Sequence, residues 1–155
     1  MTAAPDHAQV IAPPPLLVVA ALLAGGGLRF RWPMALWPWG RGWIPATACF
    51  LVAAFLAGAA VRRIWQMRTT VLPHRTTTVL VTSGPFRFTR NPIYLAMGVG
   101  MAGIALAVNS LALLVMIVPW AVVMRYGVIA REERYLEGKF GDDYRAYCRR
   151  VRRWL

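Results

Sequence analysis

Two adjacent carboxylates, Glu132 and Glu133, are the side chains of this sequence with the clearest capacity for chemistry. They directly follow a long apolar segment, and five of the six acidic residues of the chain lie between Glu132 and Asp143. A carboxylate near a bilayer is costly unless it faces a polar site. Such a pair can bind a cationic group or accept a proton. The alternative is a solvated helix turn whose glutamates form surface ion pairs with neighbouring arginines.

A third candidate, Arg125, precedes Glu132 by seven residues. In an uninterrupted α-helix this spacing places Arg125 over Glu132 and Tyr126 over Glu133, because seven residues make about two turns. The pattern predicts one polar helix face that continues from the membrane to the carboxylate pair. We therefore include Arg125 among the candidate catalytic residues.

A second motif reads Arg90-Asn91-Pro92-Ile93-Tyr94. Asn is a preferred helix N-cap and Pro suits the first helical position, so the motif is compatible with an ordinary helix start. A helix N-terminus beside Arg90 also presents unpaired N–H groups and positive potential to an anion, such as a cofactor carboxylate. Both interpretations stay open at this stage.

The helix that this motif begins carries Gly98 and Gly100. A small-residue face of this kind commonly allows two membrane helices to approach closely. The missing side chains can equally leave room for a flat group against the backbone. Tyr94 and Gly98 are four residues apart and share a helix face.

Taken in order, the motifs between about residues 75 and 151 resemble the isoprenylcysteine carboxyl methyltransferase and phospholipid methyltransferase superfamily, whose members are integral-membrane enzymes that use S-adenosylmethionine. Asn91 stands where that family usually has His, and Asn cannot titrate. The segments that carry the resemblance are Gly84-Pro85-Phe86, Arg90-Asn91-Pro92-Ile93-Tyr94, Gly98-Val99-Gly100, Glu132-Glu133, and Phe140-Gly141 with Tyr144 and Tyr147.

The resemblance implies a cofactor and a set of binding residues. Glu132 and Glu133 would hold the cationic end of S-adenosylmethionine, and Arg90 or Arg125 would balance its carboxylate or orient the methyl acceptor. The acceptor would be lipophilic: an isoprenylcysteine carboxylate, a phospholipid amine or a related molecule. The remaining wall of the cofactor site would be formed by Asn91, Pro92, Tyr94, Gly98 and Gly100.

Two other functional classes stay open. One is a nicotinamide-dependent membrane reductase, because the C-terminal membrane region of sterol reductases resembles the same family. The other is a small membrane interaction protein without enzymatic activity, in which Glu132-Glu133 is a surface pair. The sequence contains no metal-ligand spacing, so no metal is expected.

The elements that must position these residues are predicted from three uncharged blocks in a chain that is 58% hydrophobic. Residues 10–28 and 43–61 are 19 residues each, close to the roughly 20 that a membrane helix needs. Residues 91–124 are too long for one helix, and Asn109-Ser110 divides them into a hairpin whose second half continues to about residue 130. We therefore predict an all-α integral membrane protein with four transmembrane helices.

The net charge of +12 lies mainly at the ends of these blocks. Anionic lipid headgroups are therefore the expected partner, rather than nucleic acid. Residues 139–155 alternate aromatic and basic side chains, which predicts a basic amphipathic segment on the bilayer surface. The positive-inside rule places both termini and the two motifs on the cytoplasmic face of a bacterial inner membrane.

The chain divides into three parts on this evidence. Residues 1–9 are predicted to be a disordered tail, and residues 10–74 to hold the first two helices with their loops. Residues 75–155 would form the methyltransferase-like region.

Overall fold

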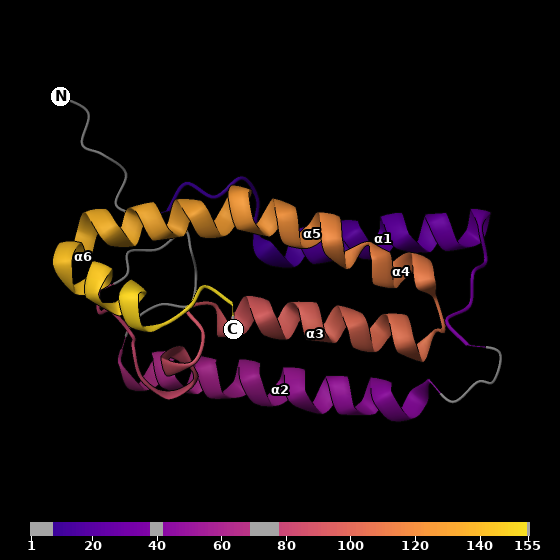
Figure 1. Ribbon diagram of the computed structural model, residues 1–155, viewed down its shortest axis with the longest axis horizontal. Helices are drawn as coiled ribbons and strands as arrows, with labels where there is room; N and C mark the ends of the chain where they lie inside the picture. Colours follow the sequence, from indigo (N-terminus) through magenta and orange to yellow (C-terminus); the bar gives the residue numbers. More distant parts are fainter. Residues whose placement is uncertain (1–7, 38–41, 69–77, 155) are drawn as a thin grey trace.

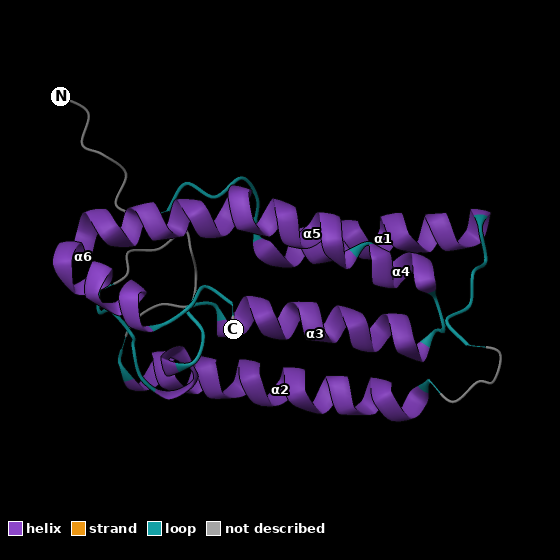
Figure 2. Ribbon diagram, in the orientation of Figure 1, coloured by secondary structure: helices purple, strands orange, loops and turns teal. Residues whose placement is uncertain are grey.

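The computed structural model describes residues 8–37, 42–68 and 78–154, and within them every regular element is a helix (Figure 1, Figure 2). In chain order these elements are α1 (Pro14–Arg31), α2 (Trp43–Gln66), the 3₁₀ turn η1 (Gly84–Arg87), α3 (Pro92–Ala107), α4 (Leu111–Val115), α5 (Ile117–Val123), the π-helix η2 (Met124–Ile129) and α6 (Ala130–Arg150).

Four rods run along the long axis of the molecule: α1, α2, α3, and the continuous path from α4 to α6 (Figure 1). In the described part of the chain, three helices are long and apolar enough to cross a membrane. The fourth rod, α3, has 16 residues and is about 24 Å long, shorter than a bilayer core of about 30 Å. The prediction of an all-α integral membrane protein is confirmed.

The predicted helical hairpin between α3 and α4 turns at Asn109 and Ser110. Asn109 has a φ of 51°, in the left-handed region that ends a helix. Its side-chain oxygen accepts the backbone N–H of Leu36 at 2.9 Å, which ties the turn to the segment after α1. Ser110 is fully buried and its hydroxyl caps α4 by accepting the N–H of Leu113. Short polar side chains satisfy the backbone at this apex, as the sequence predicts.

The rod from α4 to α6 extends beyond the membrane. From Leu111 to Phe140, before the chain folds back at Gly141, it is about 45 Å long, which exceeds a bilayer core of about 30 Å. Its uncharged part ends before Arg125, and beyond Ala130 charged residues dominate. We therefore take the membrane-spanning segment to end near Ala130, with most of α6 outside it.

Beyond the membrane, α6 folds back at Gly141. This residue has a φ of 51° and a ψ of −120°, which no helical residue adopts, and the last part of the helix returns toward α3 (Figure 1). Tyr144 and Tyr147 are each only 4% exposed, and they pack with Val151 against Leu80. The apolar face of the predicted surface segment is thus covered by the protein itself. Lipid contact through its basic side chains stays a prediction.

The N-terminal tail lies only partly within the described residues, since residues 1–7 are outside them. At its end, Ala8 is 3% exposed and the Gln9 carbonyl accepts a hydrogen bond from Arg131 at 2.8 Å. The Ile11 N–H donates to the Gly127 carbonyl of η2 at 3.2 Å, and the Ile11 side chain lies where a Cβ atom at position 127 would be. The tail is therefore packed from residue 8 onward. The predicted boundary at residues 74–75 lies outside the described residues.

Candidate active site

Two motifs of the sequence meet where the N-terminus of α3 faces α6. The Tyr94 hydroxyl donates a hydrogen bond of 2.6 Å to Oε1 of Glu132. Burial raises the pKa of Glu132 to about 7; the Tyr94 hydrogen bond opposes this rise and the negative charge of Glu133 adds to it. Glu132 is thus a partly buried carboxyl group that changes charge near neutral pH.

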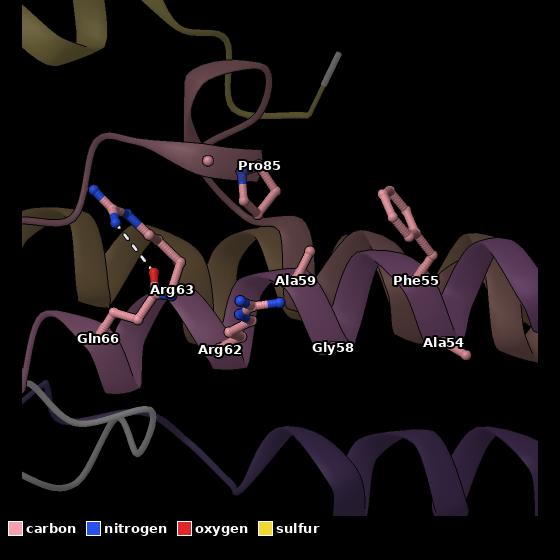
Figure 3. Close-up of a pocket in the computed structure, with 9 residues that line it drawn as sticks. Ala54, Phe55, Gly58, Ala59, Arg62, Arg63, Gln66 and Pro85 are labelled. Atoms are coloured by element: carbon pink, nitrogen blue, oxygen red, sulfur yellow. Dashed lines mark hydrogen bonds between the residues drawn. The ribbon is translucent and has the colours of Figure 1, made fainter.

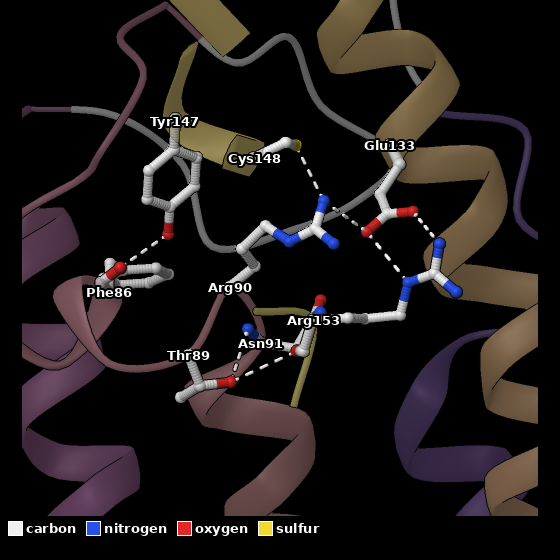
Figure 4. Close-up of polar contacts among 8 residues, drawn as sticks. All are labelled: Phe86, Thr89, Arg90, Asn91, Glu133, Tyr147, Cys148 and Arg153. Atoms are coloured by element: carbon white, nitrogen blue, oxygen red, sulfur yellow. Dashed lines mark hydrogen bonds and ion pairs between the residues drawn. The ribbon is translucent and has the colours of Figure 1, made fainter. Parts of the chain in front are cut away.

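The neighbouring carboxylate, Glu133, is engaged in a different way (Figure 4). Its two oxygens accept Nε and Nη2 of Arg153 at 3.0 and 2.5 Å. Nη1 of Arg90 lies 3.1 Å from the same carboxylate and 2.7 Å from Sγ of Cys148. The hydrogen bond to Glu133 raises the pKa of Arg153. Glu133 therefore sits between two guanidinium groups, with its charge balanced inside the protein.

The backbone after α6 is fastened to the start of α3 next to this ion-pair network. The Arg153 carbonyl accepts Nδ2 of Asn91 at 2.9 Å and the hydroxyl of Thr89 at 3.2 Å, and the Arg152 carbonyl accepts the N–H of Arg90 at 3.0 Å. Asn91 occupies the N-cap position, but its side chain does not cap α3. We call residues 151–154 the C-terminal strap. Asn91 holds this strap, in addition to standing where the helix begins.

The two glycines of the predicted cofactor wall face different neighbours. A Cβ atom at Gly98 would lie 3.2 Å from the ring of Trp120, so α5 covers this position. A Cβ atom at Gly100 would meet only Ala53 of α2, at 3.9 Å. Tyr94, on the face of Gly98, packs against the buried cluster that contains Trp120. Pro92 is buried at the start of the helix.

Among the described residues, Arg125 forms no hydrogen bond or ion pair with Glu132 or Glu133. Its side chain is exposed and its guanidinium lies 5.5 Å from the centre of the Tyr126 ring, which is itself 65% exposed. The π-helix η2 occupies most of the interval between Arg125 and Glu132. Because a π-helix has more residues per turn than an α-helix, a seven-residue spacing across it no longer returns to the same face. The expected stacking of Arg125 over Glu132 is therefore wrong.

Several residues of this site were not singled out by the sequence. Arg153 belongs to a basic tail in which nothing distinguishes it from its neighbours, and Trp120 lies in an uninterrupted apolar run. Among the described residues, Nε1 of Trp120 and Nε of Arg90 are buried without a hydrogen-bond partner. Thr89 is 2% exposed, and in the sequence only its position directly before the Arg90 motif indicated a place near the site.

The comparison with protein families identifies one family for most of this chain. The model of the phospholipid methyltransferase family matches residues 43–143, which include both Tyr94 and Glu132. The chain belongs to this family. The match to the phospholipid methyltransferase family begins at α2, whose sequence carries no motif that we singled out, and it ends before the C-terminal strap.

Individual relatives are more distant or shorter. The chain is 57% identical over 47 residues, 30% of its length, to an uncharacterized protein of Haemophilus influenzae, and covers 73% of that protein. It is 29% identical over 113 residues to the nickel-cobalt-cadmium resistance protein NccN of Alcaligenes xylosoxydans xylosoxydans and to the cobalt-zinc-cadmium resistance protein CzcN of Cupriavidus metallidurans. These two matches cover 73% of the chain but only about half of each resistance protein. No solved structure matches.

Proposed function

We propose that this protein transfers a methyl group from S-adenosylmethionine to a lipophilic acceptor at the cytoplasmic face of a membrane. The observation that carries the proposal is the contact of Tyr94 with Glu132, made between two segments of the family match that are 38 residues apart. It supports a cation-binding carboxylate at the end of a membrane helix bundle. The family supports methyl transfer as the reaction.

The side chains at this position fit the polar end of the cofactor. Only Oε1 of Glu132 takes part in the hydrogen bond from Tyr94, so its second oxygen is available to a cationic amino group. The buried and unpartnered Nε of Arg90 and Nε1 of Trp120 are donors suited to a carboxylate or a ring nitrogen. Glu133 is neutralised by Arg90 and Arg153, so we assign the cation-binding role to Glu132 in preference to Glu133.

When bound, S-adenosylmethionine supplies an electrophilic methyl group on a sulfonium centre. The protein then has to align the methyl donor with the acceptor and to exclude water from the site. Glu132 would hold the cationic end, Tyr94 orients Glu132, and the ion-pair network of Glu133 keeps α6 in register with the start of α3. These residues act through position and charge rather than by forming covalent bonds with the substrate.

The acceptor decides whether a base is needed. A carboxylate acceptor is methylated without losing a proton, whereas a protonated amine must lose one first. Glu132, with a pKa of about 7, is suited to accept that proton near neutral pH. Arg125 is exposed on the outer side of the rod, where it could contact an acceptor only from the membrane surface.

The orientation follows from charge. The segment from Arg62 to Arg90 and the region after Met124 carry fifteen of the eighteen basic residues. The positive-inside rule then directs this end of the molecule, with the Tyr94–Glu132 contact, toward the cytoplasm of a bacterial cell, where the cofactor is available.

The proposal is tested by ligand stabilisation of the detergent-purified protein. S-adenosylhomocysteine should raise the melting temperature and NADPH should not. Stabilisation by NADPH alone would favour the reductase, and stabilisation by neither would favour a non-enzymatic membrane protein. Incubation with S-adenosylmethionine carrying a labelled methyl group, followed by lipid extraction, should then identify the acceptor class.

A further inference from the structure

A groove lies between α2 and η1, two elements that take no part in the Tyr94–Glu132 contact. Its volume is about 640 Å³, within the range of about 300 to 1,000 Å³ that small-molecule sites occupy (Figure 3). One wall is formed by α2 and the other by the first residues of η1. The lining residues are Ala54, Phe55, Gly58, Ala59, Arg62, Arg63, Gln66, Gly84 and Pro85.

The α2 wall is apolar along most of its length and charged at one end. Counting back from Arg62, Ala59 and Gly58 lie three and four residues away, and Phe55 and Ala54 seven and eight. This spacing places all five residues on one helix face. Phe55 is 74% exposed, and Gly58 leaves the wall hollow because a Cβ atom there would meet nothing within 4 Å.

Arg62 marks the level at which the bilayer ends. It follows the 19 uncharged residues 43–61, so it lies at the depth of the lipid headgroups. Arg63 is engaged: its Nε donates to Ser83 at 2.7 Å and its Nη1 to Gln66 at 3.2 Å, which holds η1 against α2. Arg62 is exposed and forms no hydrogen bond or ion pair with the residues the structure describes. The described lining contains no acidic residue.

From these features we infer that the groove binds one anionic phospholipid. The phosphate would lie at Arg62 and one acyl chain along the hollow at Gly58. The occupant must be amphiphilic, because the apolar part of the groove faces the bilayer and its charged end lies at the headgroup level. Two arginines without a balancing carboxylate select a negative headgroup. This site is formed by α2 and η1, whereas the Tyr94–Glu132 contact joins α3 and α6, so the inference does not rest on methyl transfer.

Native mass spectrometry of the detergent-purified protein tests the site, with phosphatidylglycerol and phosphatidylcholine of identical acyl chains offered together. Wild-type protein should retain phosphatidylglycerol in preference. Arg62→Gln should weaken phosphatidylglycerol retention about fivefold, because one arginine near an anionic headgroup contributes about that factor. Gly58→Leu should weaken retention of both lipids, because the Leu side chain would project into the hollow from a position where a Cβ atom meets nothing within 4 Å.

Matched controls separate the groove from general effects. Arg149→Gln removes the same charge from an exposed position of α6, and Gly26→Leu adds the same side chain to α1, where a Cβ atom also meets nothing within 4 Å. Both controls should retain lipid as the wild type does. The inference is overturned if Arg62→Gln and Arg149→Gln behave alike, if Gly58→Leu retains both lipids, or if soluble glycerol phosphate displaces the lipid. Circular dichroism of each variant verifies that it is folded.

Discussion

Replacement of each glutamate in turn should separate stability from cofactor binding. Glu133→Gln removes the negative charge from between Arg90 and Arg153, whereas Glu132→Gln leaves an acceptor for the Tyr94 hydroxyl. We expect the first variant to lose stability and the second to lose affinity for the cofactor. These outcomes would assign different roles to the two adjacent positions.

The size of the stability loss follows from the burial of the network. The side chains of Glu133 and Arg90 are each 16% exposed and that of Arg153 is 29% exposed. Removing one partner of a buried ion pair costs about 3 to 5 kcal/mol, and the partial exposure of Arg153 places this network near the lower limit, at about 3 kcal/mol. For a chain of this size that corresponds to a fall in melting temperature of about 6 to 12 °C. Thermal unfolding in detergent, followed by tryptophan fluorescence, measures it.

The loss of affinity is measured by the same assay with S-adenosylhomocysteine. At a ligand concentration of 100 times the Kd, wild-type protein should gain about 2.7 kcal/mol. A charge-assisted contact contributes about 1.5 to 3 kcal/mol, so Glu132→Gln should bind about ten- to a hundredfold more weakly. At the same ligand concentration the gain then falls to between about 0.4 and 1.4 kcal/mol.

The matched control is Glu137→Gln. Glu137 lies on the same helix and pairs with Arg145 at 3.4 Å, but both side chains are about half exposed. Such a surface pair contributes little, so this variant should melt and bind as the wild type does. Our reasoning would be refuted if Glu133→Gln melted with the wild type, or if Glu132→Gln kept the full ligand-induced gain.

Three further predictions concern pH, helix packing and orientation. Cofactor affinity should rise as the pH increases from 6 to 8, because Glu132, whose pKa is raised to about 7, then gains the negative charge that would bind the cation. Isothermal titration calorimetry measures this rise, and Glu132→Gln should not show it. Gly103→Ala should lower the melting temperature, because its Cβ atom would lie 2.9 Å from the Phe50 ring, whereas Gly100→Ala, with 3.9 Å to its nearest neighbour, should melt near the wild-type temperature. Reporter fusions within residues 69–77 and at the C-terminus should both give cytoplasmic signals, and a periplasmic signal from either would contradict the proposed orientation.

The sequence was sufficient to predict where the candidate site lies and some of the residues that form it. The N-cap and proline pattern at Asn91-Pro92 correctly marked the start of α3, and the carboxylate pair after the apolar run marked the start of α6. An even number of helix crossings brings these two positions to one end of the molecule. The sequence did not distinguish the two glutamates, because the difference between them lies in partners that are far away in the chain.

The error over Arg125 has a local cause. A spacing argument assumes one helical repeat throughout, and the six-residue π-helix η2 changes that repeat between Arg125 and Glu132. The sequence of η2, Met-Arg-Tyr-Gly-Val-Ile, contains no pattern that predicts a π-helix. Packing of Met124, Val128 and Ile129, each with no exposed surface, accompanies it.

The amino-acid sequence by itself determined the membrane helices, their hairpin and the end of the molecule where the charged motifs gather. Length and hydrophobicity of a segment are properties of the linear chain, and they decide whether the segment can span a bilayer of fixed thickness. Tertiary structure alone decided that Glu132 faces Tyr94 while Glu133 joins Arg90 to Arg153. It also decided that the C-terminal strap closes over the start of α3, through a hydrogen bond between residues 62 positions apart. Such contacts depend on helix register and on the fold at Gly141, which only the packed molecule specifies.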